Sequence, residues 1–301
     1  MPAGSAWTYA PHRHAVTAEA AALTGLPVGV PVAVGTVDAL AEALSVGVAG
    51  PGDLMIMYGS TTFFVLIIDR PLAAGPLWLT AGVEPGRWAF AAGLATSGSA
   101  MAWFRDQFAR DLIAADAAGG PNAFAALAAE ADAAIGGDPL LFLPYLSGER
   151  TPINDPAARG VLAGLSLHST RGDAYRGLLL GIAYATRANL EAMHALGAKI
   201  SRVVAVGGGT ANRLLLELVS DAGGIEQVTP ASTVGAARGG AFLAGLASGS
   251  LQRDDLASWV EVADTIRPDP MTRGAHDRRF AAFGGLYDAT RTTVHELAAD
   301  A

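Results

Sequence analysis

The sequence contains no cysteine, which excludes disulfide bonds, thiol catalysis and cysteine-ligated zinc. Positive charge is also scarce: Lys199 is the only lysine, and the formal net charge is −8. Nucleic-acid-binding proteins usually carry a basic patch, and none is visible here. No run of about 18 apolar residues without charge occurs, which argues against a membrane-spanning helix. These absences argue against nucleic acid and membrane as partners, and they are compatible with a cytoplasmic location.

Aromatic residues are few as well, at 7% of the sequence against 51% for all apolar residues. Alanine and glycine therefore make up much of the apolar content, which favours close packing of helices on a sheet and glycine-containing turns. A length of 301 residues suffices for one large domain or two modest ones with a buried core.

Apolar runs alternate with helical patterns along the chain, which predicts an α/β fold. Two β-rich runs that flank residues 59–62 predict a hairpin, so we expect a mixed sheet flanked by helices. This combination suits an actin-like ATPase (ribonuclease H-like) domain better than an all-parallel sheet. The small-residue helix predicted at 234–246 could pack against the sheet. We expect strands at 28–34, 54–58, 63–68, 88–92 and 203–206, and helices at 38–48, 99–108, 173–196, 212–221, 234–246 and 277–297.

Asp38 lies just beyond the strand predicted at 28–34 and begins the next helix. Catalytic groups in α/β sheets gather at the carboxyl ends of strands, where a carboxylate could accept a proton from an attacking hydroxyl. Aspartate is also a common helix N-cap, which stabilises a helix by about 1 kcal/mol. From the pattern alone, the cap is the more frequent explanation.

Two glycine-containing turns could contact a phosphate. Gly59-Ser60-Thr61-Thr62 places backbone N–H groups and hydroxyls at one turn, and residues 207–212 follow a strand and open a helix. Ordinary turns use the same residues, so neither signal is specific by itself. Residues 207–212 match neither the P-loop, because no Gly-Lys-Ser/Thr follows, nor the dinucleotide-binding fingerprint.

The order of the motifs is more specific, and it resembles the FGGY family of carbohydrate kinases, xylulokinase-like members above all. The resemblance is concentrated in residues 143–152, Leu-Pro-Tyr-Leu-Ser-Gly-Glu-Arg-Thr-Pro, and in 155–160, Asp-Pro-Ala-Ala-Arg-Gly, and it extends over residues 25–298. The flanking matches are Gly35-Thr36-Val37-Asp38, Gly59-Ser60-Thr61, Ser97-Gly98-Ser99 with Trp103, Gly207-Gly208-Gly209 with Asn212, Gly235-Ala236-Ala237, and Phe280, Phe283 and Tyr287.

The resemblance implies a role for each matching residue. Asp38 would be the catalytic base that takes the proton from the sugar hydroxyl. Glu149 and Arg150 would be structural members of the cleft wall. ATP would bind with Mg²⁺, which would bridge its phosphates, and no residue of the chain is expected to be a metal ligand. The residues implied in nucleotide binding are Ser60 beside the transferred phosphate, Gly98 at the phosphates, Gly208 and Asn212 at the adenosine, and in addition Thr61 and Gly209.

Members of the family contain two actin-like domains, and this sequence lacks most of the first. We therefore expect residues 1–49 to be a remnant of the amino-terminal sugar-binding domain and residues 50–301 to be the carboxy-terminal nucleotide-binding domain. The partners implied are a small-molecule sugar, and either a second copy in a homodimer or a chain that supplies the missing domain.

Three functions follow from these patterns. The first is an ATP-dependent phosphotransferase that transfers the γ-phosphate to a hydroxyl of a sugar, a pentulose such as xylulose. The alternative is a truncated, non-catalytic fragment that binds a nucleotide or a partner. The third, an actin-like hydrolase or activator ATPase, shares the glycine turns but does not account for residues 143–152.

Overall fold

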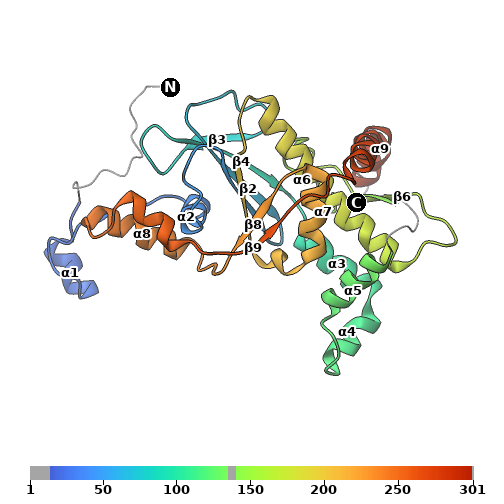
Figure 1. Cartoon of the computed structure of the whole chain (residues 1–301), viewed down its shortest axis with the longest axis horizontal. Helices are drawn as coiled ribbons and strands as arrows, with labels where there is room; N and C mark the ends of the chain where they lie inside the picture. Colours follow the sequence, from blue (N-terminus) through green and yellow to red (C-terminus); the bar gives the residue numbers. More distant parts are fainter. Residues whose placement is uncertain (1–13, 135–139, 300–301) are drawn as a thin grey trace.

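The structure is a computed structural model that describes residues 14–134 and 140–299, so part of the expected remnant at 1–49 lies outside the described residues. Its centre is a mixed seven-stranded sheet in the order β3-β4-β2-β1-β7-β8-β9 (Figure 1). β1 pairs in parallel with β7 and β7 with β8, while the other neighbours are antiparallel. This confirms the predicted mixed α/β sheet. The strands are β1 (Asp53–Tyr58), β2 (Thr62–Ile68), β3 (Trp78–Ala81), β4 (Trp88–Leu94), β7 (Arg202–Val206), β8 (Gln227–Pro230) and β9 (Val262–Ile266), with a separate pair, β5 (Leu141–Leu143) and β6 (Val161–Ala163).

The helices confirm most of the predicted ones. Among the described residues, no helix is both long and apolar enough to cross a membrane. The helices are α1 (Ala18–Thr24), α2 (Asp38–Ser45), α3 (Gly98–Phe108), α4 (Arg110–Ala117), α5 (Ala123–Ala133), α6 (Arg171–Ala195), α7 (Arg213–Gly223), α8 (Ala236–Ser248) and α9 (Arg273–Ala299), with 3₁₀ turns η1 (Gly208–Ala211) and η2 (Arg253–Trp259).

The central strands are covered on both faces, which explains their nearly continuous apolar sequences. Side chains alternate along a strand, so Leu54 and Ile56 of β1 enter the core that includes α6 and α7, whereas Met55 enters the core that includes α2. The two cores fix the register of the strands, because a shift by one residue would exchange the faces.

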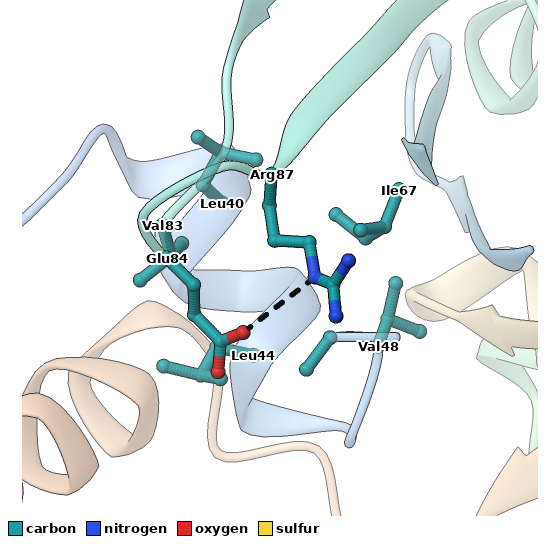
Figure 2. A pocket seen from close by; sticks show the side chains of 8 residues that line it. Leu40, Leu44, Val48, Ile67, Val83, Glu84 and Arg87 are labelled. Atoms are coloured by element: carbon teal, nitrogen blue, oxygen red, sulfur yellow. Dashed lines mark ion pairs between the residues drawn. The ribbon is translucent and has the colours of Figure 1, made fainter. Parts of the chain in front are cut away.

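Arg87 fills a gap between α2 and the sheet. Figure 2 shows its guanidinium among Leu40, Leu44 and Ile67, and its Nε lies 4.0 Å from Oε2 of Glu84. The space that remains is about 10 Å³, close to the least that holds one water molecule. This gap is therefore part of the packing and cannot hold a substrate.

The prediction of a strand at residues 28–34 is wrong. This segment is paired only locally, through the bridge between Ala15 and Pro31 and its neighbouring hydrogen bonds. Val28, Val32 and Val34 are exposed, because this segment pairs with no strand of the described sheets. The pattern indicated that the segment can form a strand, but a strand also needs a partner.

Helix α8 differs from the prediction as well, because it packs mainly on α2 and not on the sheet. Leu44 of α2 forms a cluster with Phe242 and Leu243 of α8. A Cβ at Gly239 would lie 1.9 Å from the carbonyl oxygen of Ala41, so the small residues of α8 allow two helix backbones to approach closely.

Candidate functional site

A cavity of about 770 Å³ lies where β1 and β7 end. This is the end of an α/β sheet at which ligands usually bind, and the volume suits a small molecule. The walls come from the turn after β1, the start of α3, one face of α5, and η1 with the first turns of α7. The lining residues are Tyr58, Gly59, Ser60, Gly98, Met101, Asn122, Phe124, Ala125, Ala128, Ala129, Asp132, Gly208, Gly209, Ala211, Asn212, Arg213, Leu214 and Glu217.

The cavity brings together five of the predicted site residues from distant parts of the sequence. They are Ser60, Gly98, Gly208, Gly209 and Asn212. The fold thus unites two turns that were individually unspecific in the sequence.

The other two predicted residues, Thr61 and Asp38, do not line this cavity. Thr61 is half-buried in the turn before β2, where its carbonyl accepts a hydrogen bond from the N–H of Gly59. Its predicted part in nucleotide binding stays a prediction.

The turn after β1 packs backbone to backbone against the start of α3. The N–H of Gly98 donates to the carbonyl of Gly59 (3.0 Å), while the N–H groups of Ser97 and Ser99 both donate to the carbonyl of Ser60 (3.0 Å each). A Cβ at Gly98 would lie 2.5 Å from the carbonyl oxygen of Gly59, so only glycine fits. A direct hydrogen bond from the N–H of Gly98 to a phosphate would first require the bond to Gly59 to break.

The three glycines after β7 meet different constraints. Gly207 has a φ of 90°, and a Cβ there would lie 2.6 Å from the carbonyl oxygen of Tyr58. A Cβ at Gly209 would lie 2.7 Å from Cβ of Tyr58, whereas a Cβ at Gly208 would meet no atom within 4 Å. Gly208 therefore borders open space in the cavity, and Gly207 and Gly209 serve the close approach of η1 to β1.

Asn212 is the N-cap of α7. Its Oδ1 accepts a hydrogen bond from the N–H of Leu215 (3.1 Å), and its Nδ2 lies 3.9 Å from Sδ of Met101. The capped start of α7 faces the cavity, and the positive end of a helix dipole favours negative or polar ligand groups there. Helix capping is therefore enough to explain why residue 212 is an asparagine, and Asn212 lines the cavity in addition.

A wall that the sequence did not reveal comes from α5. Ala125, Ala128 and Ala129 are spaced three and four residues apart, so they share one face of this helix. They form a smooth apolar surface next to Phe124, over whose ring the guanidinium of Arg105 lies at 4.5 Å. The spacing of the alanines was visible in the sequence, but this alanine-rich region offered many such sets.

The floor of the cavity is rigid. Tyr58 is fully buried, and its hydroxyl donates to Oε1 of Gln227 (2.6 Å). Gln227 in turn donates to the carbonyl of Leu216 and to Oγ of Ser220 (3.0 Å each). Burial raises the pKa of Tyr58, so its hydroxyl stays neutral.

Asp38 is exposed at the first turn of α2, and its Oδ1 accepts a hydrogen bond from the N–H of Ala39 (2.8 Å). The N-cap of this helix is Val37, so the interpretation of Asp38 as the cap is wrong. Its carboxylate is nevertheless favourable near the positive end of the helix dipole. The role as catalytic base stays a prediction.

Within residues 14–134 and 140–299, no group of three or more acidic or histidine side chains could hold a metal ion. The carboxylates that line the cavity are Asp132 and Glu217. Mg²⁺ is commonly bound through one or two carboxylates together with substrate phosphates. The lining therefore fits Mg²⁺ that is bound mainly by the phosphates of a ligand.

The chain is similar in sequence to known carbohydrate kinases. The family model for the carboxy-terminal domain of the FGGY family of carbohydrate kinases matches residues 54–248. The ribulokinase of Mycolicibacterium smegmatis is 32% identical over 286 residues, which cover 91% of this chain and 50% of that protein. The xylulose kinase of Escherichia coli (strain K12) is 29% identical, over 86% of this chain and 52% of that protein.

Among solved structures, the xylulose kinase from Rhodospirillum rubrum matches with a TM-score of 0.84 and 34% sequence identity. The match covers 93% of this chain and 56% of that chain. The chain thus spans about half the length of the relatives it matches.

Proposed function

The chain belongs to the FGGY family of carbohydrate kinases, and we propose that it binds the nucleotide in a kinase that transfers the γ-phosphate of ATP to a hydroxyl of a sugar. The observation that carries this proposal is the cavity of about 770 Å³, on which five of the residues predicted to bind a nucleotide converge. The start of α7 and the hydroxyl of Ser60 offer polar groups to phosphates, while α5 offers an apolar wall to a base.

We propose a pentulose such as xylulose or ribulose as the sugar, because the similar proteins include a ribulokinase and xylulose kinases. In the reaction, Asp38 would take the proton from the sugar hydroxyl. The hydroxyl oxygen would form a bond to the γ-phosphorus while the bond between the γ-phosphorus and the leaving oxygen of ADP breaks. Mg²⁺ bound to the phosphates would spread their negative charge.

Two measurements test this proposal. Isothermal titration calorimetry with ATP and ADP in the presence of Mg²⁺ should show binding, and a coupled assay of ADP release should show turnover with xylulose or ribulose. Asp38→Asn should abolish turnover and leave ATP binding unchanged, because Asp38 does not line the cavity. The absence of binding at millimolar ATP would contradict the proposal.

A second candidate is a nucleotide-binding or partner-binding fragment that does not catalyse phosphate transfer by itself. The observation that favours it is the exposure of Asp38 and of the valines between residues 28 and 34, outside the cavity. Exposed apolar residues in one segment are typical of a protein interface. The occupant would be a second copy in a homodimer or a chain that supplies the other half of the fold. ATP binding without turnover on any pentulose would favour this candidate, and light scattering after size-exclusion chromatography would report the homodimer.

A further inference from the structure

We propose that Glu149 is a positioning residue, which holds the segment 95–98 and, through it, the turn Gly59–Ser60 in the shape that receives the phosphates of a nucleotide. The proposal rests on the proposed function, because it gives Glu149 a part in nucleotide binding. Glu149 itself does not line the cavity and acts through other groups.

Glu149 is buried at a cost. Its exposed fraction is 5%, and its Oε1 accepts hydrogen bonds from the N–H groups of Ala95 and Arg150 (2.7 Å each). Burial raises the pKa of Glu149 to about 7, although the two N–H donors act in the opposite direction. An apolar side chain of similar shape would avoid the cost of a buried carboxylate but would leave both N–H groups without an acceptor, so packing alone does not explain this residue.

The path from Glu149 to the cavity is short. Ala95, whose N–H is held by Glu149, directly follows β4 and leads into α3. Two residues later, Ser97 donates to the carbonyl of Ser60, and Gly98 then donates to the carbonyl of Gly59. Ser60, Gly59 and Gly98 all line the cavity. A shift of Ala95 would therefore be passed directly to the lining.

The same segment is held to the Glu149 loop at a second point. The hydroxyl of Thr96 donates to the carbonyl of Pro144. The segment 95–98 is thus fixed from one side by residues 144–149 and fixes the turn after β1 on its other side.

Three buried polar atoms near this path have no hydrogen-bond partner among the described residues. They are Oε2 of Glu149, Oγ of Ser97 and Oγ1 of Thr62. Thr62 pairs in register with Leu94, and Ser97 contacts the same turn. Buried polar groups normally have a hydrogen-bond partner, and departures from this rule are expected at functional sites. Three unpaired polar atoms therefore lie on Glu149, on the segment it holds and at the start of β2, next to the turn that lines the cavity.

Thr151 provides a matched control in the same loop. Its Oγ1 accepts a hydrogen bond from the N–H of Gly93 (2.8 Å) and donates to Oδ1 of Asn189 (2.7 Å). Like Glu149 it is buried, but its hydrogen bonds hold the loop to Gly93 of β4 and Asn189 of α6 and do not run to residues 95–98. Thr151→Val therefore perturbs the loop without removing the contact to Ala95.

The experiment compares ATP, ADP and adenosine, each titrated into the wild-type chain, Glu149→Ala, Glu149→Gln and Thr151→Val by calorimetry with Mg²⁺. Glu149→Ala should weaken ATP and ADP about 10- to 100-fold, as expected for the loss of hydrogen bonds to a charged group, while adenosine binding stays within about twofold. Glu149→Gln should recover most of the affinity, because its amide oxygen can accept both hydrogen bonds. Thr151→Val should lower the melting temperature and keep the ratio of ATP to adenosine affinity.

Wild-type ATP affinity in Glu149→Ala would overturn the proposal, and so would an equal loss of ATP and adenosine. If Glu149→Ala does not fold, Glu149→Asp replaces it, because a side chain shorter by one methylene cannot keep both hydrogen bonds. Folded Glu149→Asp with wild-type ATP affinity would then be the contradicting result. Failure of the wild-type chain to bind ATP would instead contradict the proposed function itself, so the two failures differ.

Discussion

Two regions of the molecule carry the predicted site residues, and they differ in how their backbones are held. The turns at 59–61 and 207–212 follow β1 and β7, which lie in the middle of the sheet and are paired on both sides. Residues 25–37, which lead to Asp38, have only the short local pairing around Ala15 and Pro31. The residues that follow β1 and β7 are positioned by the sheet, whereas Asp38 is positioned by helix α2, because the segment before it pairs with no strand of the sheet.

The same difference appears in burial. Val65 of β2 is 1% exposed, but Val28 is 64% and Val34 is 55% exposed. Fully burying a valine stabilises the fold by on the order of 2 kcal/mol. The valines of the sheet contribute this stabilisation, whereas the exposed valines of residues 28–34 do not. Helix α2 is nevertheless well anchored through the buried Leu40 and Leu44. Asp38 thus lies at the border between a fixed helix and a segment without a sheet.

The largest effect is expected from alanine at Gly98. A Cβ there meets the carbonyl oxygen of Gly59 at 2.5 Å, which should lower the free energy of unfolding by about 3 kcal/mol and abolish ATP binding. The counterpart is Gly35→Ala in the other region, where no atom lies within 4 Å of the added Cβ and only the positive φ of 75° is unfavourable, so a loss of about 1–2 kcal/mol is expected. Denaturant unfolding measures both, and equal losses would contradict the difference between the regions.

A smaller effect is expected from shortening valines. Val65→Ala should lower the free energy of unfolding by about 2 kcal/mol, because it leaves a cavity under α2. Val32→Ala should change it by less than about 0.5 kcal/mol, since Val32 is 47% exposed. A Val32→Ala loss comparable with that of Val65→Ala would mean that residues 28–34 are buried in solution, by a second copy or another part of a larger assembly.

A substitution at Gly208 tests ligand binding in the cavity separately from the stability of the fold. A methyl group there enters open space, so Gly208→Ala should weaken ATP binding about tenfold and leave the free energy of unfolding nearly unchanged. Gly240→Ala on α8 is the control, because Gly240 also has no atom within 4 Å of the added Cβ but lies outside the cavity. Calorimetry with ATP and thermal unfolding distinguish the two, and unchanged ATP binding in Gly208→Ala would argue against this cavity as the nucleotide site.

The contrast between the regions also explains how far the sequence could lead. Strands such as 54–58 and 203–206 were predicted because apolar runs end at glycines, and those strands happen to lie side by side in the structure. The segment 28–34 has an equally good pattern, but a pattern gives the capacity to form a strand and not the partner. Similarly, Gly98 was expected to contact a ligand, whereas its closeness to Gly59 depends on which two turns meet and is invisible before the fold is known.

The smallest effect is a pH dependence that belongs to the region built on the sheet. His276 of α9 is 5% exposed, and its Nδ1 lies 3.1 Å from the hydroxyl of Tyr184 on α6. Burial lowers the pKa of His276, with further lowering by Arg279, Arg187 and Arg176 and a countering effect of Asp221. Because the folded pKa lies below the unfolded one, the contribution to stability is complete above about pH 6.5 and is lost as the pH falls below it.

The melting temperature should therefore fall by a few degrees between pH 7 and pH 5, in part through His276. His276→Gln should reduce this fall, since glutamine does not titrate and can still accept or donate a hydrogen bond near Tyr184. His194→Gln is the control, because His194 lies exposed at the end of α6. An identical fall in wild type and His276→Gln would show that His276 does not contribute to the pH dependence of stability.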